Sequence, residues 1–168
     1  MVKGNTISKI KAPDAYGRIG NQAGSEVSIV VLGDYKVDKD AELERPTRVT
    51  LTDTANNKLR LVDVKASYSF RSLGRGPKGE ALVLGTDGKL RVIDPNSANV
   101  VREIPVVKPW TEPTDWHQPR PTLFVQGEHA WVSEPASKKL HMVHLSDGEV
   151  EQSIQLDVVP DELNGVEG

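Results

Sequence analysis

Short runs of β-branched and other apolar residues, separated by turns, recur along this chain of 168 residues. The apolar period of an amphipathic helix is almost absent. Asp-Gly pairs stand between successive runs at Asp87–Gly88 and Asp147–Gly148, where glycine tolerates the positive φ of a hairpin turn. The pattern therefore predicts an all-β fold of antiparallel hairpins. The predicted strands are residues 26–33, 48–53, 58–64, 80–85, 89–94, 99–106, 121–127, 129–135, 139–145 and 149–156.

Three of these runs resemble one another: KLRLVDV from Lys58, KLRVIDP from Lys89 and KLHMVHL from Lys139. In this alignment His144 takes the place of Asp63 and Asp94. Repeats of about 40 to 50 residues are typical of four-stranded propeller blades. We therefore predict one domain over residues 1–168, a partial β-propeller of about three four-stranded antiparallel blades. The expected blades are residues 20–64, 66–107 and 119–160, and a β-sandwich of the same hairpins is the alternative.

Three blades are too few to close a ring of about 4 to 8 blades. The open ends of such an arc leave sheet edges exposed, and exposed edges favour association with another chain. Self-association of the arc is therefore an expected property of these residues.

The composition argues against several classes of function. With 24 acidic and 21 basic residues, the chain has no electrostatic reason to bind nucleic acid or an anionic membrane. No apolar run approaches the roughly 18 residues of a spanning helix, so membrane insertion is not expected. The absence of cysteine excludes thiolate catalysis and cysteine zinc sites.

The sequence lacks two motifs that are typical of enzymes. SLGRGPKGE, from Ser72, has the wrong spacing for a phosphate-binding loop and is predicted to be a turn. No GxSxG nucleophile motif occurs. We expect a binding protein and not an enzyme.

The segment VVKPWTEPTDWHQPRP, residues 106–121, carries four prolines and two tryptophans. Because proline lacks a backbone donor and fixes φ, this segment is predicted to be an extended loop between blades. Trp110 and Trp116 either anchor the loop on the core or line a surface. In the second case Trp110, Trp116 and Arg120 are the candidate residues for binding a protein or cell-surface ligand.

The four histidines are His117, His129, His141 and His144. On a strand, His141 and His144 lie about 10 Å apart and point to opposite faces, so they cannot share one ion. His117 stands two residues from Asp115 in the proline-rich loop, where side chains can converge. His117, Asp115 and His129 are therefore the candidate metal ligands. The alternative is that all four histidines are ordinary surface or edge residues without a metal.

Three stretches carry a family resemblance: ELERPTRVTLTDTANNKLRLVDV, SYSFRSLGRGPKGEALVLGTDGKLRVIDP, and the segment from WTEPTDWHQPRP to LSDGEV. From about Gly33 to near the end, the sequence resembles the C-terminal part of the AztD-type zinc metallochaperones. The resemblance implies an exported bacterial β-propeller, periplasmic or secreted, that binds zinc and passes it to the solute-binding protein of a zinc ABC transporter.

The resemblance also implies what these residues lack. The histidine- and acid-rich metal-binding segment of the family has no match here, so no zinc ligand of the family is carried over to a residue of this chain. We expect any tight zinc site to be incomplete within residues 1–168. His117, His129 and His144 stand where relatives are expected to carry other residues, which argues against a zinc site within these residues more than against zinc handling by the whole protein.

Overall fold

The computed structural model describes residues 47–165 except 54, 70 and 116, together with the backbone of four strands nearer the N terminus. A short pair, β1 (Val2–Lys3) and β2 (Thr6–Ile7), stands apart from three four-stranded antiparallel sheets. The first sheet holds β3 (Tyr16–Ile19), β4 (Ile29–Lys36), β5 (Arg48–Asp53) and β6 (Lys58–Asp63). The middle sheet holds β7 (Leu73–Arg75), β8 (Ala81–Leu84), β9 (Lys89–Asp94) and β10 (Asn99–Pro105). The last sheet holds β11 (Leu123–Gln126), β12 (His129–Glu134), β13 (Lys139–His144) and β14 (Val150–Gln155).

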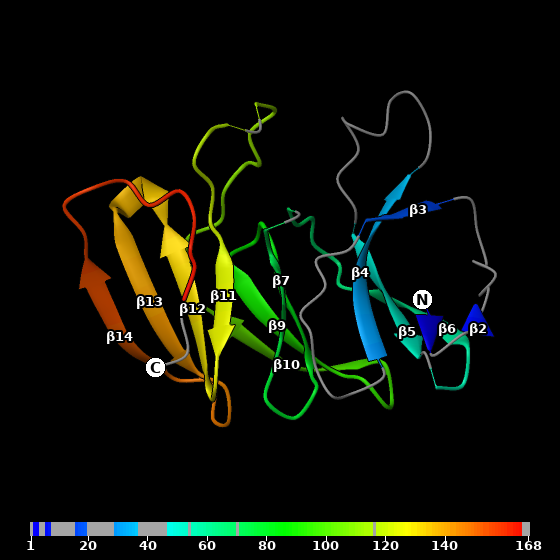
Figure 1. Ribbon diagram of the computed structural model, residues 1–168. Coiled ribbons are helices and arrows are strands. Elements are labelled where there is room, and N and C mark those ends of the chain that lie inside the picture. The colour runs from blue at the N-terminus through cyan, green and yellow to red at the C-terminus, as the bar shows by residue number, and fades with distance from the viewer. Residues whose placement is uncertain are drawn as a thin grey trace.

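The three sheets follow one another in an arc (Figure 1), and in each the strands lie side by side in chain order. One apolar core lies between the first and middle sheets, and a second lies between the middle and last sheets. The middle sheet is therefore buried on both faces, which two stacked sheets of a sandwich would not produce. The predicted all-β, partial propeller fold with three four-stranded antiparallel sheets is confirmed.

Alternation along the strands explains how the middle sheet fills both cores. Ala81, Val83 and Ile93 pack toward the first sheet, whereas Leu82, Leu84, Leu90 and Val92 pack toward the last. Because successive side chains of a strand point to opposite faces, a strand covered on both sides must be apolar at nearly every position. Ala81–Leu84 meets that requirement at every position, whereas β9 places the buried Arg91 among Leu90, Val92 and Ile93.

The equivalence of Asp63 with Asp94 and His144 is wrong. β6, which contains KLRLVD, is the fourth strand of its sheet, whereas β9 and β13 are third strands. The true counterpart of Asp94 is Asp53, at the end of the third strand β5. Each of these two carboxylates accepts hydrogen bonds from the backbone N–H groups two and three residues further on. Third and fourth strands carry similar apolar patterns, so the shared Lys-Leu start was misleading.

The glycine-rich segment from Ser72 is only partly the turn that its composition predicted. Leu73–Arg75 form β7, the first strand of the middle sheet, which pairs with β8. A Cβ atom at Gly74 would lie 2.9 Å from Cγ2 of Val125, which belongs to β11. Glycine here allows the first strands of two neighbouring sheets to approach closely. In the part of the chain that the structure describes, no helix is long and apolar enough to cross a membrane.

Substitution of Gly88 by alanine should destabilise the fold more than the same change at Gly127. Both residues have positive φ, 83° and 57°, which costs any L-residue roughly 1 kcal/mol. At Gly88 the new Cβ would also lie 2.0 Å from the carbonyl oxygen of Val107, whereas nothing lies within 4 Å of it at Gly127. Chemical denaturation of the two variants should show a Gly88→Ala loss larger by at least about 1 kcal/mol. Equal losses would contradict the crowding at the Val107 carbonyl.

Candidate metal centre on the last sheet

Three potential metal ligands converge at one end of the last sheet. His129 begins β12 and His144 ends β13, and the two residues are directly paired across the strands with ring centroids 5.3 Å apart. Nε2 of His129 lies 3.2 Å from Oε2 of Glu151, on β14. One ligand atom from each residue lies within 4.8 Å of the others. We call His129, His144 and Glu151 the ligand trio.

The hairpin between β12 and β13 sets this pairing. A 3-10 turn, Pro135–Ser137, and Lys138 in the left-handed conformation close the hairpin and pair Glu134 with Lys139. Counting back along both strands places His129 opposite His144. The pair lies on the same face as Trp131 and Met142, because these are two residues away on each strand. Ala130, Val132 and Val143 occupy the other face, in the core against the middle sheet.

A β-bulge brings Glu151 to the two histidines. β14 pairs Val150 with Val143 but Gln152 with Met142, so Glu151 is an extra residue without a partner in the strand register. Bulges redirect a side chain in this way. The middle sheet has a bulge at the corresponding place, where Val101 lies between paired Val100 and Arg102. The middle and last sheets therefore share a bulge that the pairing of β5 with β6 in the first sheet lacks, and the residue placed on it differs between the two.

The middle sheet provides an internal comparison for the ligand trio. From the pairings of Ala81 with Ile93 and Ala130 with Val143, the counterpart of His129 is Glu80 and that of His144 is Asp94. The counterpart of Glu151 is Val101. Of these two sheets, the last one alone carries two imidazoles and a carboxylate on this backbone, and this combination of nitrogen and oxygen donors suits zinc.

Acidic groups surround His144. Its Nδ1 atom lies 2.9 Å from Oδ2 of Asp147 and 3.1 Å from Oγ of Ser146. The hydrogen bond to Asp147 raises the pKa of His144, and the negative charges of Glu151 and Glu128 add to the effect. The pKa of Asp147 is lowered, first by the backbone N–H of Glu149 and then by His144. A carboxylate on one imidazole nitrogen leaves the other to bind a metal and strengthens it as a ligand.

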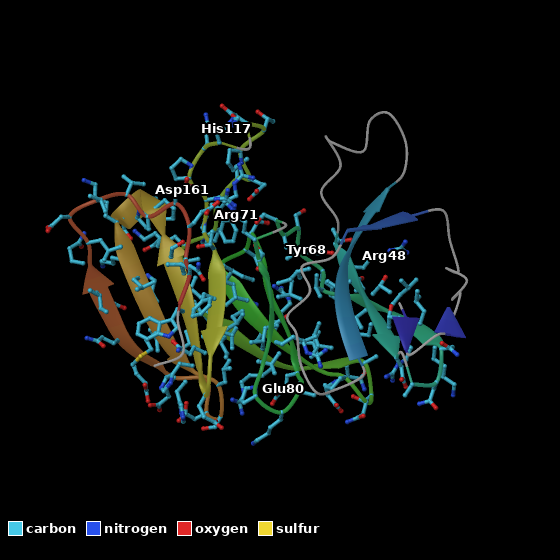
Figure 2. The ribbon with its side chains drawn as sticks, viewed as in Figure 1. Arg48, Tyr68, Arg71, Glu80, His117 and Asp161 are labelled. Carbon is cyan, nitrogen blue, oxygen red and sulfur yellow. The ribbon has the colours of Figure 1, made fainter. Side chains whose placement is uncertain are left out.

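The structure divides the three metal ligands predicted from the sequence. His117 and Asp115 lie in the proline-rich loop with side chains 78% and 56% exposed, and Nδ1 of His117 is 3.2 Å from Oδ1 of Asp115. His129 follows β11, which runs from that loop to the opposite end of the sheet (Figure 1). Figure 2 shows His117 at one end of the molecule and Glu80, the counterpart of His129, toward the other. Metal binding by Asp115 and His117 stays a prediction.

His141 and His144 do point to opposite faces. Nδ1 of His141 lies 2.8 Å from Oγ of Ser153, and Nε2 lies 3.4 Å from Oε2 of Glu134. His141 is buried, and the backbone N–H of Lys108 donates to the other oxygen of Glu134. These contacts fasten the start of the proline-rich loop to the last sheet.

The loop residues predicted to bind a partner lie in different environments. Trp110 packs against the core between the middle and last sheets, and its Nε1 donates to Glu112. Arg120 is buried and donates to Oε1 of Glu112 at 2.8 Å and to the carbonyl of Asp115 at 2.7 Å. Trp116 lies outside the described residues. The contacts of Trp110 and Arg120 hold the loop together, and partner binding by Trp110, Trp116 and Arg120 stays a prediction.

Two members of the ligand trio, His144 and Glu151, were not predicted as ligands. The strand register contained the signal for His144, because a short hairpin after Glu134 pairs residues 129 and 144. For Glu151 the strand pattern gave no such signal, since the bulge shifts the pairing by one residue.

Comparison with known proteins bears on the fold. No protein-family model and no curated protein matches the chain. Among solved structures, apo AztD from Citrobacter koseri aligns with a TM-score of 0.67 and 20% identity, over 86% of this chain and 35% of that one. BamB from Moraxella catarrhalis aligns with a TM-score of 0.58 and 16% identity, over 82% of this chain and 38% of that one. The chain therefore resembles AztD in fold and spans about a third of its length.

Proposed function

We propose that this chain is part of an extracytoplasmic zinc-binding chaperone that holds the ion at His129, His144 and Glu151 and delivers it to the solute-binding protein of a zinc ABC transporter. The observation that carries the proposal is the convergence of two imidazoles and a carboxylate within 4.8 Å. The fold resemblance to AztD, together with the sequence resemblance to zinc metallochaperones, supports zinc as the ion and export as the setting.

Three protein ligands suit an ion that must be released. Structural zinc sites are closed by four protein ligands, whereas sites with three keep one position for water or an incoming group. All three ligands here are partly exposed, so a donor from another protein can reach the ion. Zinc would then pass to the recipient while ligands of both proteins hold it, without release of a free ion.

The proposal is tested by metal binding followed by transfer. Cobalt(II), used as a spectroscopic substitute for zinc, should give the intense visible absorption of a four-coordinate site at one equivalent, and zinc should bleach it. The zinc-loaded chain should transfer its metal to a metal-free zinc solute-binding protein faster than it transfers the metal to a chelator of equal zinc affinity. Absence of the cobalt spectrum would contradict metal binding at this site. If zinc moved to the solute-binding protein no faster than to the chelator, delivery to that protein would be contradicted.

A propeller scaffold that binds a protein or cell-surface ligand is the second candidate. A pocket of about 400 Å³ lies beside Trp110, between the proline-rich loop and the 3-10 turn. Its lining combines prolines and Trp110 with Glu134 and Ser137. Apolar walls with a few polar groups are typical of ligand pockets, so a ligand bound there should protect Trp110 from fluorescence quenching.

A further inference from the structure

The pocket beside Trp110 lies between the proline-rich loop and the 3-10 turn, which share one end of the molecule (Figure 1). Its lining residues come from two limbs of the loop, residues 108–113 and 118–121, and from the turn, residues 134–137. The ligand trio lies at the opposite end of the last sheet, where β12 begins and β13 ends. The pocket is therefore a site separate from the proposed zinc site.

The two limbs of the loop are held in place before any ligand binds. Arg120 forms a buried ion pair with Glu112, and its guanidinium also donates to the carbonyl oxygens of Asp115 and Gln118. Proline rings restrict the backbone further. Five prolines line the pocket: Pro109, Pro113, Pro119, Pro121 and Pro135. A preformed pocket loses little conformational entropy on binding, so even a few weak contacts can hold a ligand there.

Glu134 joins the loop to the turn at the base of the pocket. One oxygen of its carboxylate accepts from the backbone N–H of Lys108, and the other accepts from the hydroxyl of Ser137 and lies 3.4 Å from Nε2 of His141. The Glu134 side chain is 11% exposed. The first limb and the turn are thus fixed to each other through one buried group.

Trp110 supplies a flat apolar wall. Among the described residues that line the pocket, it is the one aromatic side chain. The indole packs against the core between the middle and last sheets, and its Nε1 donates to Oε2 of Glu112 at 3.0 Å. An indole fixed in this way offers a ring surface on which the C–H groups of a ligand can pack.

The polar part of the lining is mixed and has no excess charge. Thr111, Gln118 and Ser137 carry hydroxyl and amide groups, which both donate and accept hydrogen bonds. The ammonium of Lys108 and the carboxylate of Glu134 have opposite charges. A strongly charged ligand finds no matching excess charge in this lining. A neutral ligand with several hydroxyl groups finds partners of both kinds.

We propose that this pocket binds a neutral saccharide, packed on Trp110 and hydrogen-bonded by Thr111 and Gln118. The inference rests on the second candidate function, names its ligand class and is independent of zinc binding. A pyranose ring has C–H groups on its faces and hydroxyl groups around its rim, which matches an apolar wall with polar groups beside it. The volume of about 400 Å³ lies within the range of small-molecule sites and suits a short saccharide.

A proline-rich peptide matches the pocket less well. Grooves that recognise such peptides are lined by aromatic side chains, whereas prolines form most of the apolar lining here. The peptide is therefore included in the experiment as the competing ligand.

Saturation-transfer NMR with maltose, cellobiose and diacetylchitobiose at millimolar concentration tests the proposal. At least one of these disaccharides should receive saturation from the protein. Thr111→Ala and Gln118→Ala should each weaken its binding by about fivefold, because each removes a hydrogen-bonding group. Both residues are exposed, so the fold should be retained. Thr114→Ala changes an exposed residue of the same loop that does not line the pocket, and this matched control should bind the disaccharide as the unchanged chain does.

The outcomes separate the saccharide from the other proposals. Failure of all three disaccharides to bind overturns it, and so does binding that Thr111→Ala and Gln118→Ala leave unchanged. Binding of a decaproline peptide in place of the disaccharides also overturns it, but leaves the second candidate function standing. Cobalt titration of the same variants reports on the ligand trio alone. Loss of cobalt binding in the unchanged chain would contradict the zinc function without affecting this pocket.

Discussion

Replacing His144 by aspartate and Glu151 by valine should abolish specific zinc binding and leave the fold intact. Asp94 and Val101 occupy the corresponding places of the middle sheet, so both new side chains fit a blade of this kind. The change removes the Glu151 carboxylate and one of the two imidazoles, and a shorter carboxylate takes the place of the His144 nitrogen donor. We expect zinc affinity to fall at least roughly a hundredfold, or about 2.7 kcal/mol, in competition with a chromophoric chelator.

The matched control for this double variant is His117→Ala. His117 is 78% exposed and lies in the proline-rich loop, so its loss should leave zinc affinity unchanged within about twofold. If His117→Ala weakened zinc binding and the double variant did not, the ion would be held by the loop and not by the last sheet.

Arg120→Ala should be among the most destabilising single substitutions of a polar residue in the described chain. The side chains of Arg120 and Glu112 are 1% and 3% exposed, and they form a 2.8 Å ion pair. Removal of one partner leaves the other charge buried and unpaired, which typically costs about 3 to 5 kcal/mol. The guanidinium also donates to two loop carbonyls, of Asp115 and Gln118. Urea denaturation should show a loss in that range.

Arg71→Ala is the comparison for Arg120→Ala. Arg71 pairs with Asp161 and Glu162, whose side chains are 53% and 71% exposed. Exposed ion pairs contribute about 1 kcal/mol or less, so this variant should lose correspondingly little stability. Similar losses in the two arginine variants would contradict the distinction between a buried and an exposed pair.

Local sequence signals were enough to predict most of the strands and the overall fold. Asp-Gly turns and short apolar runs follow from backbone geometry and strand alternation, which act within a few residues. The assignment of KLRLVDV to a third strand failed because position within a sheet depends on long-range pairing. Asp53, and not Asp63, precedes the turn that corresponds to that of Asp94. β7 was missed because Gly74 serves a contact with another sheet, at Val125.

The site was predicted less completely than the fold. The sequence showed that His141 and His144 cannot share an ion, and the structure agrees. It did not show that His144 shares a face with His129, since that depends on where the hairpin closes. The position of Glu151 depends on the bulge in β14. A single extra residue in a strand does not change the apolar pattern enough for the sequence to reveal the bulge. A candidate metal centre formed from three strands thus depends on register more than on motif.

The most direct measurement is anomalous diffraction at the zinc edge from crystals of the chain grown with one equivalent of zinc. Our account predicts a single strong peak between His129, His144 and Glu151, at about 2.0 to 2.2 Å from their ligand atoms. A peak at His117 and Asp115 with none at the ligand trio, or no peak in crystals that contain zinc in solution, would contradict it.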